Sequence, residues 1–467
     1  MNADYKAFLA AKVAVDTPTG FDPPADLNPL LFPFQAAIVR WACLRGRAAV
    51  WADCGLGKSF IALEWSRLVA EHTRRPVLIL TPLAVAEQFV SEGAKFSEQI
   101  RLCRDGAEVG AGVNVTNYER LHRFDVSRFS GVVADESSIL KDFSSQTRKT
   151  LVESFAATPF RLACTATPAP NDFTELGNHA EFLGAMTRTE MLSRFFVHDG
   201  GNTQEWRLKR HAEADFWRWV CSWAVALRTP SDIGFSDEGY KLPGLEIQDE
   251  IVRNSDDLAQ AEGLLFAVEA KTLDEQRAAR RSSLPERVAR CAELVAAEPA
   301  EPWIIWCDLN AESDALTAAI PGAVEVRGSD DAEEKVENLR RFSTGEIKRL
   351  VTKPSIAGHG MNWQHCARVA FVGLSHSWEQ WYQAIRRTYR FGQTRPVRCH
   401  MISSEAEGAV AANLRRKQAD AERMLASMVG AVSELQAETF GALVRSRDEY
   451  LPTSRITLPP WLFTEAA

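Results

Sequence analysis

The segment RAAVWADCGLGKSFIALE, residues 47–64, constrains the fold most, because it places an apolar β-type run, a glycine-containing loop and a helix-forming stretch in immediate succession. Such a loop bends tightly and directs backbone N–H groups at phosphate oxygens, and the following helix presents its positive N-terminal end. Gly55 and Gly57 permit the bend, Lys58 is expected to reach the β and γ phosphates, and Ser59 to offer a hydroxyl ligand to Mg²⁺. The segment predicts a nucleoside triphosphate site; the alternative is an ordinary glycine turn before a helix.

A second apolar run, GVVADESS at 131–138, ends in two adjacent carboxylates. At the carboxyl end of a strand, Asp135 is expected to hold Mg²⁺ through water, while Glu136 orients and deprotonates the water that attacks the phosphate. An isolated Asp-Glu pair is most often part of a solvated loop. Its position one strand away from a phosphate loop favours the catalytic interpretation.

Apolar runs alternate with helical segments along two stretches of the chain, which predicts an α/β fold with two parallel-sheet lobes. We expect an N-terminal leader over 1–27 and a first lobe over 28–253, with a helical elaboration from about 173. A helical linker over 254–284 follows, with a basic cluster at 276–283 that most resembles a solvated helix face. The second lobe covers 285–405, and 406–467 form a C-terminal helix and a tail.

The composition is typical of a protein without membrane spans or disulfides, but it does not show whether the protein binds nucleic acid. No stretch approaches the roughly 18 uninterrupted apolar residues of a membrane span, so we expect a cytoplasmic protein. The nine cysteines are scattered without a CxxC pair, which predicts reduced thiols that lie mostly in the core. The net charge of −8 argues mildly against a protein that coats nucleic acid by bulk electrostatics, but it leaves room for a local basic groove.

The discriminating motif is SWEQWYQAIRRTYRFGQ at 377–393. Gln383, Arg387 and Arg390 follow one another at spacings of four and three, which places them on one face of a helix. Arginines at this spacing usually form a solvated or salt-bridged face. Because the second lobe has no phosphate loop of its own, we expect Arg387 and Arg390 instead to act across the cleft on the transferring γ-phosphoryl group. The neighbouring tryptophans 363, 378 and 381 are more consistent with core packing than with stacking on a base.

Together these motifs resemble the superfamily-two helicases, and most closely their Swi/Snf-like branch. The resemblance covers roughly residues 28–405. It is carried by LLFPFQ at 30–35, ADCGLGKS at 52–59, ILTPLAVAEQF at 79–89, VTNYERL at 115–121, TATPAPND at 165–172, ALRTPSDIGFSDEGYKLP at 226–243, SIAGHGMNWQHCARV at 355–369 and QAIRRTYRFGQ at 383–393. Two departures stand out. Ser138 occupies a place where the family usually has histidine, and Arg386 a place where glycine is common.

The resemblance implies two RecA-like lobes with ATP and Mg²⁺ bound between them. It assigns ATP contacts to the phosphate loop, residues Asp53, Cys54, Gly55, Leu56, Gly57, Lys58 and Ser59, and to Gln35 and Gly360. It also assigns phosphate contacts along DNA to Thr81, Pro82, Thr116, Asn117, Thr352, Lys353 and Ser355. Helix capping and turn formation explain the threonines and the asparagine equally well.

The expected activity is that of a DNA-dependent ATPase, a helicase or double-stranded DNA translocase of a compact bacterial or phage type. Two alternatives remain open: an ATP-gated DNA-binding regulator, and the motor subunit of a restriction or nuclease complex. A protein partner would bind residues 173–285 or the C-terminal helix.

Overall fold

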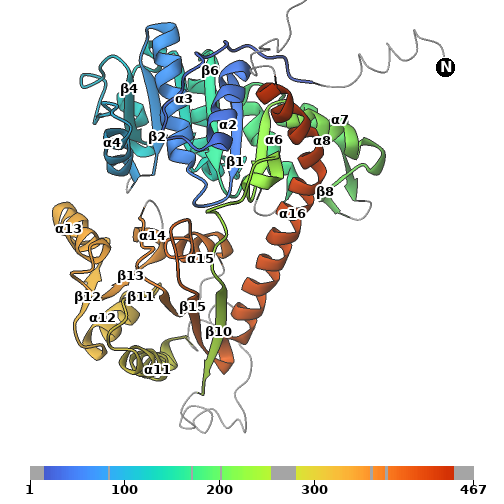
Figure 1. The fold of residues 1–467 in the computed structure, drawn as a ribbon. Helices are drawn as coiled ribbons and strands as arrows, with labels where there is room; N and C mark the ends of the chain where they lie inside the picture. The colour runs from blue at the N-terminus through green and yellow to red at the C-terminus, as the bar shows by residue number, and fades with distance from the viewer. Residues whose placement is uncertain are drawn as a thin grey trace, which may run out of the picture.

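The computed structural model describes residues 15–82, 85–169, 172–199, 202–253, 280–357, 361–373 and 377–445. These residues form two parallel β-sheets, each covered by helices, and Figure 1 shows the two resulting lobes one above the other. The prediction of an α/β fold with two RecA-like lobes is confirmed. In both sheets the central strands are buried on both faces, which explains why their sequences are continuous apolar runs.

The first sheet has the strand order β3-β4-β2-β5-β6-β1-β9 among the described residues. Its strands are β1 (Arg47–Ala52), β2 (Val77–Thr81), β3 (Arg101–Leu102), β4 (Val113–Asn117), β5 (Gly131–Asp135), β6 (Phe160–Thr165) and β9 (Ala224–Leu227). Helices α2 (Pro33–Arg45), α3 (Lys58–Thr73) and α4 (Ala86–Lys95) pack on one face. Helices α5 (Gln146–Ser154), α6 (Leu176–Leu183), α7 (Arg188–Phe195) and α8 (Glu213–Cys221) pack on the other.

The second sheet has the order β10-β15-β14-β11-β13-β12. Its strands are β10 (Leu245–Val252), β11 (Trp303–Trp306), β12 (Ala323–Val326), β13 (Arg349–Thr352), β14 (Arg368–Val372) and β15 (Val397–Ser404). One face carries α11 (Leu284–Ala297) and α12 (Asn310–Ala319), and the other carries α13 (Ala332–Ser343), α14 (Pro354–Ala357) and α15 (Trp378–Ile385). The tryptophans of β11 and those at 363, 378 and 381 are buried in this lobe, as predicted.

The predicted boundary between the lobes at residue 253 is wrong. Strand β10 pairs in parallel with β15 over all eight of its residues, from Leu245 opposite Val397 to Val252 opposite Ser404, and therefore belongs to the second sheet. Its sequence, LEIQDEIV, alternates apolar and polar residues and therefore does not show which of the two sheets the strand joins. The elaboration from residue 173 is also not wholly helical, because it contains the antiparallel pair β7 (Phe196–Asp199) and β8 (Asn202–Leu208). Most of the predicted linker, 254–279, lies outside the described residues.

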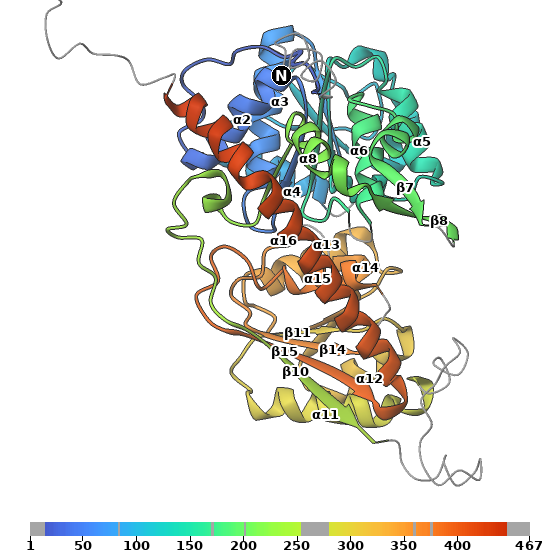
Figure 2. The same cartoon turned by 90° about the vertical axis from the view of Figure 1, so that its right-hand side faces the viewer.

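A single long helix, α16 (Gly408–Arg445), joins the two lobes. It starts beside the end of β15 and crosses to the first lobe, where it packs against α8, β9 and α2 (Figure 2). Met428, Val432 and Phe440 enter the cores of the first lobe. The side-chain amide of Gln436 pairs with both backbone groups of Ala226, at 3.0 and 3.1 Å, and so covers the open edge of β9. None of the described helices, α16 included, combines the length and apolarity needed to cross a membrane.

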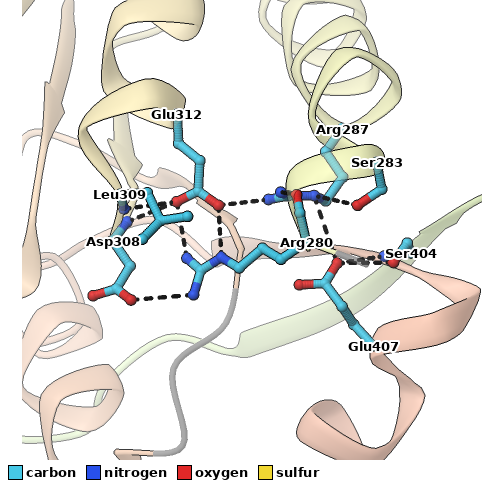
Figure 3. Close-up of polar contacts among 8 residues, drawn as sticks. All are labelled: Arg280, Ser283, Arg287, Asp308, Leu309, Glu312, Ser404 and Glu407. Atoms are coloured by element: carbon cyan, nitrogen blue, oxygen red, sulfur yellow. Dashed lines mark hydrogen bonds and ion pairs between the residues drawn. The ribbon is translucent and has the colours of Figure 1, made fainter. Parts of the chain in front are cut away.

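A buried ion-pair network fixes the second lobe where α11, α12 and the 3-10 helix before α16 meet (Figure 3). Glu312 of α12 is fully buried and accepts from Arg280 Nε at 2.7 Å and from Arg287 Nη1 at 2.9 Å. Burial disfavours the charged carboxylate, but the hydrogen bonds and charge of Arg280, together with the charge of Arg287, outweigh it and lower the pKa of Glu312. Asp308 adds a second carboxylate, 3.1 Å from Arg280.

The same network reaches the short 3-10 helix Glu405–Glu407, which directly precedes α16. Arg287, which is also fully buried, lies 3.5 Å from Glu407, and Glu407 accepts from the backbone N–H of Ser404 at 3.0 Å. Gly373, with φ +87°, lies against these side chains, and a Cβ there would come within 2.4 Å of Glu312 Oε1. The base of α16 is therefore attached to the second lobe by charges as well as by chain connectivity.

We predict that Glu312→Gln lowers the free energy of unfolding of the second lobe by about 3 to 5 kcal/mol, because the amide leaves two buried guanidinium groups without their shared carboxylate. Denaturant unfolding followed by tryptophan fluorescence measures this. Glu337→Gln is the matched control, since Glu337 pairs with Arg340 on the exposed face of α13 and its loss should change the midpoint little. Equal midpoints for Glu312→Gln and the wild type would contradict the prediction.

Candidate active site between the lobes

The phosphate loop connects β1 to α3 at the carboxyl edge of the first sheet. Gly55 and Gly57 have φ values of +92° and +78°, which other residues rarely adopt. Both glycines also lie in tight contacts: a Cβ on Gly57 would be 2.3 Å from Gln35 Nε2, and one on Gly55 would be 2.9 Å from the backbone nitrogen of Phe391. Lys58 begins α3 and donates to the carbonyl of Ala52 at 2.9 Å. The predicted strand, loop and helix are present in the expected order.

Gln35 supports this loop from α2. Its amide nitrogen donates to the carbonyl of Leu56 at 2.9 Å, and its amide oxygen accepts from the backbone N–H of Phe32 at 3.0 Å. The resemblance assigned an ATP contact to this glutamine. In the structure its side chain lies beside the loop and hydrogen-bonds the loop backbone at Leu56.

The carboxylate pair lies at the end of β5, a neighbour of β2 and β6 in the sheet. Burial and the adjacent charge of Glu136 raise the pKa of Asp135 to about 7, although the charge of Lys58 and a hydrogen bond from Thr81 oppose this shift. Thr81 Oγ1 donates to Asp135 Oδ2 at 3.2 Å. The structure thus brings Lys58, Asp135 and Glu136 together, because the carboxyl ends of parallel strands meet at one edge of a sheet.

These residues fit Mg²⁺. The ion is usually held by one or two carboxylates together with waters and substrate phosphates, so Asp135 and the Ser59 hydroxyl at the start of α3 suffice from the protein side. Asp135 is buried and Glu136 directly follows it, so a cation at this edge of the sheet would be attracted by both carboxylates. Mg²⁺ bound there would neutralise charge on the β and γ phosphate oxygens.

The arginines of the second lobe reach the same place, but not from a continuous helix as predicted. Helix α15 ends at Ile385, and Arg387 and Arg390 lie in the turns that follow. Hydrogen bonds from the Thr388 hydroxyl and the Tyr389 N–H to the Ile385 carbonyl close the helix end. The two guanidinium groups still converge, because each has an Nη1 near the carbonyl of Met361, at 3.5 and 3.3 Å. Gln383, the third predicted residue, is buried within α15.

Arg387 is buried, and Arg390 is partly buried with its Nε enclosed. Burial lowers the pKa of Arg387, and the nearby Asp135 and Glu136 of the first lobe oppose this shift. Burial and the charge of Arg387 lower the pKa of Arg390 to about 10. Among the described residues, neither forms an ion pair with a carboxylate within 4 Å, and Arg390 Nε has no hydrogen-bond partner there. An environment of this kind favours an anion between the lobes.

The loop and the second lobe also touch directly, through contacts that the sequence did not reveal. Arg386 lies 2.8 Å from the carboxylate of Asp53 and donates to the carbonyl of Cys54 at 2.8 Å, and the hydroxyl of Tyr382 donates to Asp53. Although burial opposes its charge, Asp53 holds the pKa of Arg386 above its ordinary value. The arginine that replaces a common glycine therefore joins the lobes.

Two further features of the site were missed. Glu92 of α4 is buried, its pKa is raised by burial, and its electrostatic neighbours are Ser59 and Arg390. The sequence around Glu92 does not distinguish it from a glutamate on a solvent-exposed helix face. The ring of Tyr240 stacks on Phe391 with centroids 4.7 Å apart, so that an aromatic pair spans the lobes beside the loop. Both rings line a cavity of about 400 Å³ together with Asp53 and Arg386.

Comparison with known proteins agrees with this geometry. Residues 286–392, which contain β11 to β14 and both arginines, match the family model described as the helicase conserved C-terminal domain. The match shows that this segment is similar to the C-terminal domain of helicases. None of the curated proteins compared with the chain matches it.

Four of the seven predicted DNA contacts are buried in this structure. The side chains of Thr81, Thr116, Asn117 and Thr352 are buried and cannot reach a DNA phosphate in this structure. Strand ends covered on both faces bury side chains that point either way, and sequence spacing does not show this. Pro82, Lys353 and Ser355 are accessible. Gly360, the remaining predicted ATP contact, lies outside the described residues.

A buried histidine stands beside the catalytic pair. His179 of α6 is fully buried, its Nε2 lies 3.1 Å from Ser137 Oγ, and its ring meets the edge of Trp51. Burial lowers its pKa to about 4, so it is neutral at physiological pH. Its position next to Ser137, one residue from the place where the family usually has histidine, was not visible in the sequence.

We predict that lowering the pH destabilises the first lobe because of His179. Below the ordinary pKa of 6.5, the unfolded chain binds a proton that the folded protein does not take until about pH 4. The free energy of unfolding therefore drops by about 1.4 kcal/mol for each pH unit by which the pH is lowered within this window. Above pH 6.5 the contribution of His179 does not depend on pH. His179→Gln should remove this part of the slope when unfolding free energies at about pH 7.5 and 5.5 are compared. The same slope in both proteins would refute the assignment.

Proposed function

We propose that the protein is a DNA-dependent ATPase that acts as a helicase or double-stranded DNA translocase of the Swi/Snf-like branch. The single observation that carries the proposal is the position of Arg387 and Arg390, which form no ion pair among the described residues, beside the phosphate loop and the carboxylate pair of the other lobe. The helicase C-terminal domain match over 286–392 supports the superfamily. Its compact bacterial or phage origin and cytoplasmic location remain predictions.

The proposed reaction divides between the lobes. Backbone N–H groups of the loop and the ammonium group of Lys58 bind the β and γ phosphates of ATP. Glu136 orients a water and accepts its proton as the water oxygen bonds to the γ-phosphorus and the bond to the bridging oxygen breaks. Arg387 and Arg390 stabilise the charge on the transferring group. ADP and phosphate leave when the lobes separate.

We expect hydrolysis to depend on DNA because the catalytic groups come from both lobes. The two arginines act only when the second lobe is docked, and DNA held across both lobes would favour that arrangement. Pro82 on the first lobe and Lys353 with Ser355 on the second follow the carboxyl ends of β2 and β13 and are accessible to such a strand. Contacts of this kind are to phosphates and carry no base sequence.

We predict that duplex DNA stimulates ATP turnover and that two variants separate binding from chemistry. Lys58→Ala should weaken nucleotide binding, because it removes a charge from the phosphates. Glu136→Gln should retain ATP binding and lose hydrolysis by at least about 10²-fold, because the amide cannot accept the water's proton. Nucleotide affinity and single-turnover rates, each with and without DNA, measure both effects.

Arg398→Ala is the control, since Arg398 makes only half-exposed ion pairs on β15 and should behave like the wild type. Equal turnover with and without DNA would contradict the proposed function. Hydrolysis by Glu136→Gln at the wild-type rate would remove Glu136 from the reaction.

A further inference from the structure

The backbone of Glu136 is held in an unfavourable conformation. Its φ and ψ are 51° and 52°, in the left-handed region, and within the described part of the chain Arg74 and Ser97 are the other two residues besides glycine with positive φ. A residue with a side chain adopts this conformation only where its surroundings impose it, and such positions cluster at functional sites. Something must therefore hold the proposed catalytic base from both sides.

Two buried hydrogen bonds flank Glu136. On one side, the hydroxyl of Tyr118 donates to the carbonyl of Asp135 at 2.7 Å. On the other side, Ser137 Oγ and His179 Nε2 are 3.1 Å apart. Tyr118 and His179 come from different elements on either side of β5, so together they fix the peptide units before and after the base. Neither side chain carries a charge that would disturb Glu136.

Tyr118 also connects the base to the accessible surface. It immediately follows β4 and begins a short 3-10 helix, Tyr118–Arg123, which the Asn117 side chain caps. The outer face of this turn exposes Glu119, His122 and Arg123, and Arg120 is half-buried, so its two arginines outnumber its one carboxylate. The strand order β4-β2-β5 means that Tyr118 spans one intervening strand to reach Asp135. A basic surface turn and the catalytic backbone are thus one buried hydrogen bond apart.

We infer that Tyr118 and His179 are positioning residues that hold the backbone of Glu136 for hydrolysis, and that Tyr118 links this backbone to phosphate contacts made by the basic turn 118–123. The inference rests on the proposed function. It assigns to Tyr118 a role beyond packing, because its ring fills the core while its hydroxyl alone reaches Asp135. His179 lies on the opposite side of the base and has no such connection to the turn.

The test removes one hydrogen bond at a time. Tyr118→Phe keeps the ring, and Ser137→Ala removes the partner of His179. Thr116→Val is the matched control: it lies on β4 two residues before Tyr118, and its buried hydroxyl has no hydrogen-bond partner in the described structure. Each protein is assayed for kcat and KM for ATP with and without duplex DNA, for DNA affinity and for melting temperature.

Tyr118→Phe should lower the DNA-stimulated kcat about fivefold, the effect of one lost hydrogen bond, and should lower the ratio of stimulated to basal kcat. KM for ATP should stay unchanged. Ser137→Ala should lower the basal and stimulated kcat by the same factor, and Thr116→Val should match the wild type. A melting temperature equal to that of the wild type excludes loss of fold.

The inference is overturned if Tyr118→Phe is indistinguishable from Thr116→Val in kcat, or if Ser137→Ala retains full kcat. It is also overturned if Tyr118→Phe changes KM instead of kcat. These outcomes differ from failure of the proposed function, which would appear as a wild-type enzyme whose turnover ignores DNA. In that case the basal kcat of Ser137→Ala still reports on the positioning of Glu136.

Discussion

Buried, uncompensated charge is the constraint on which the site depends. Arg387 is buried and Arg390 partly buried, and among the described residues neither has a carboxylate within ion-pair distance; across the cleft, Asp135 and Glu136 place two carboxyl groups side by side. Such an arrangement destabilises the folded protein because the charged groups are removed from water without a partner. A ligand that carries an anion for the arginines and a cation for the carboxylates would offset this cost. A triphosphate with Mg²⁺ has this composition, and its binding between the lobes would relieve both deficits.

The rest of the structure controls how the two halves meet. Arg386 and Tyr382 bind Asp53 of the phosphate loop, so the second lobe contacts the loop directly, without a phosphate between them. Helix α16 spans both lobes, anchored at its start by the network around Arg287 and Glu312 and at its end by the first lobe's core. Rotation of one lobe against the other must therefore involve the Asp53 contact and the long helix together.

The sequence predicted what local patterns determine and missed what tertiary contacts determine. The phosphate loop and the apolar strands were visible because glycine placement and continuous hydrophobic runs have strong local causes. Strand β10 was assigned to the wrong lobe because its pairing partner lies about 150 residues away along the chain. The basic cluster resembled a solvated face, yet Arg280 pairs with the buried Glu312, a carboxylate 32 residues further along. The burial of Thr81 and the approach of Tyr118 to Asp135 arise only when the strands align.

The central claim is that the lobe-two arginines recognise charge on the transferring phosphoryl group. The most direct measurement compares the affinity of the wild type and of the double variant Arg387→Ala, Arg390→Ala for ADP and for ADP with aluminium fluoride, in the presence of Mg²⁺ and duplex DNA. The account predicts that the variant keeps its affinity for ADP but loses about 10³-fold or more for the transition-state mimic, comparable with the loss of other arginines in this role. Equal losses for both ligands, or none for the mimic, would contradict it.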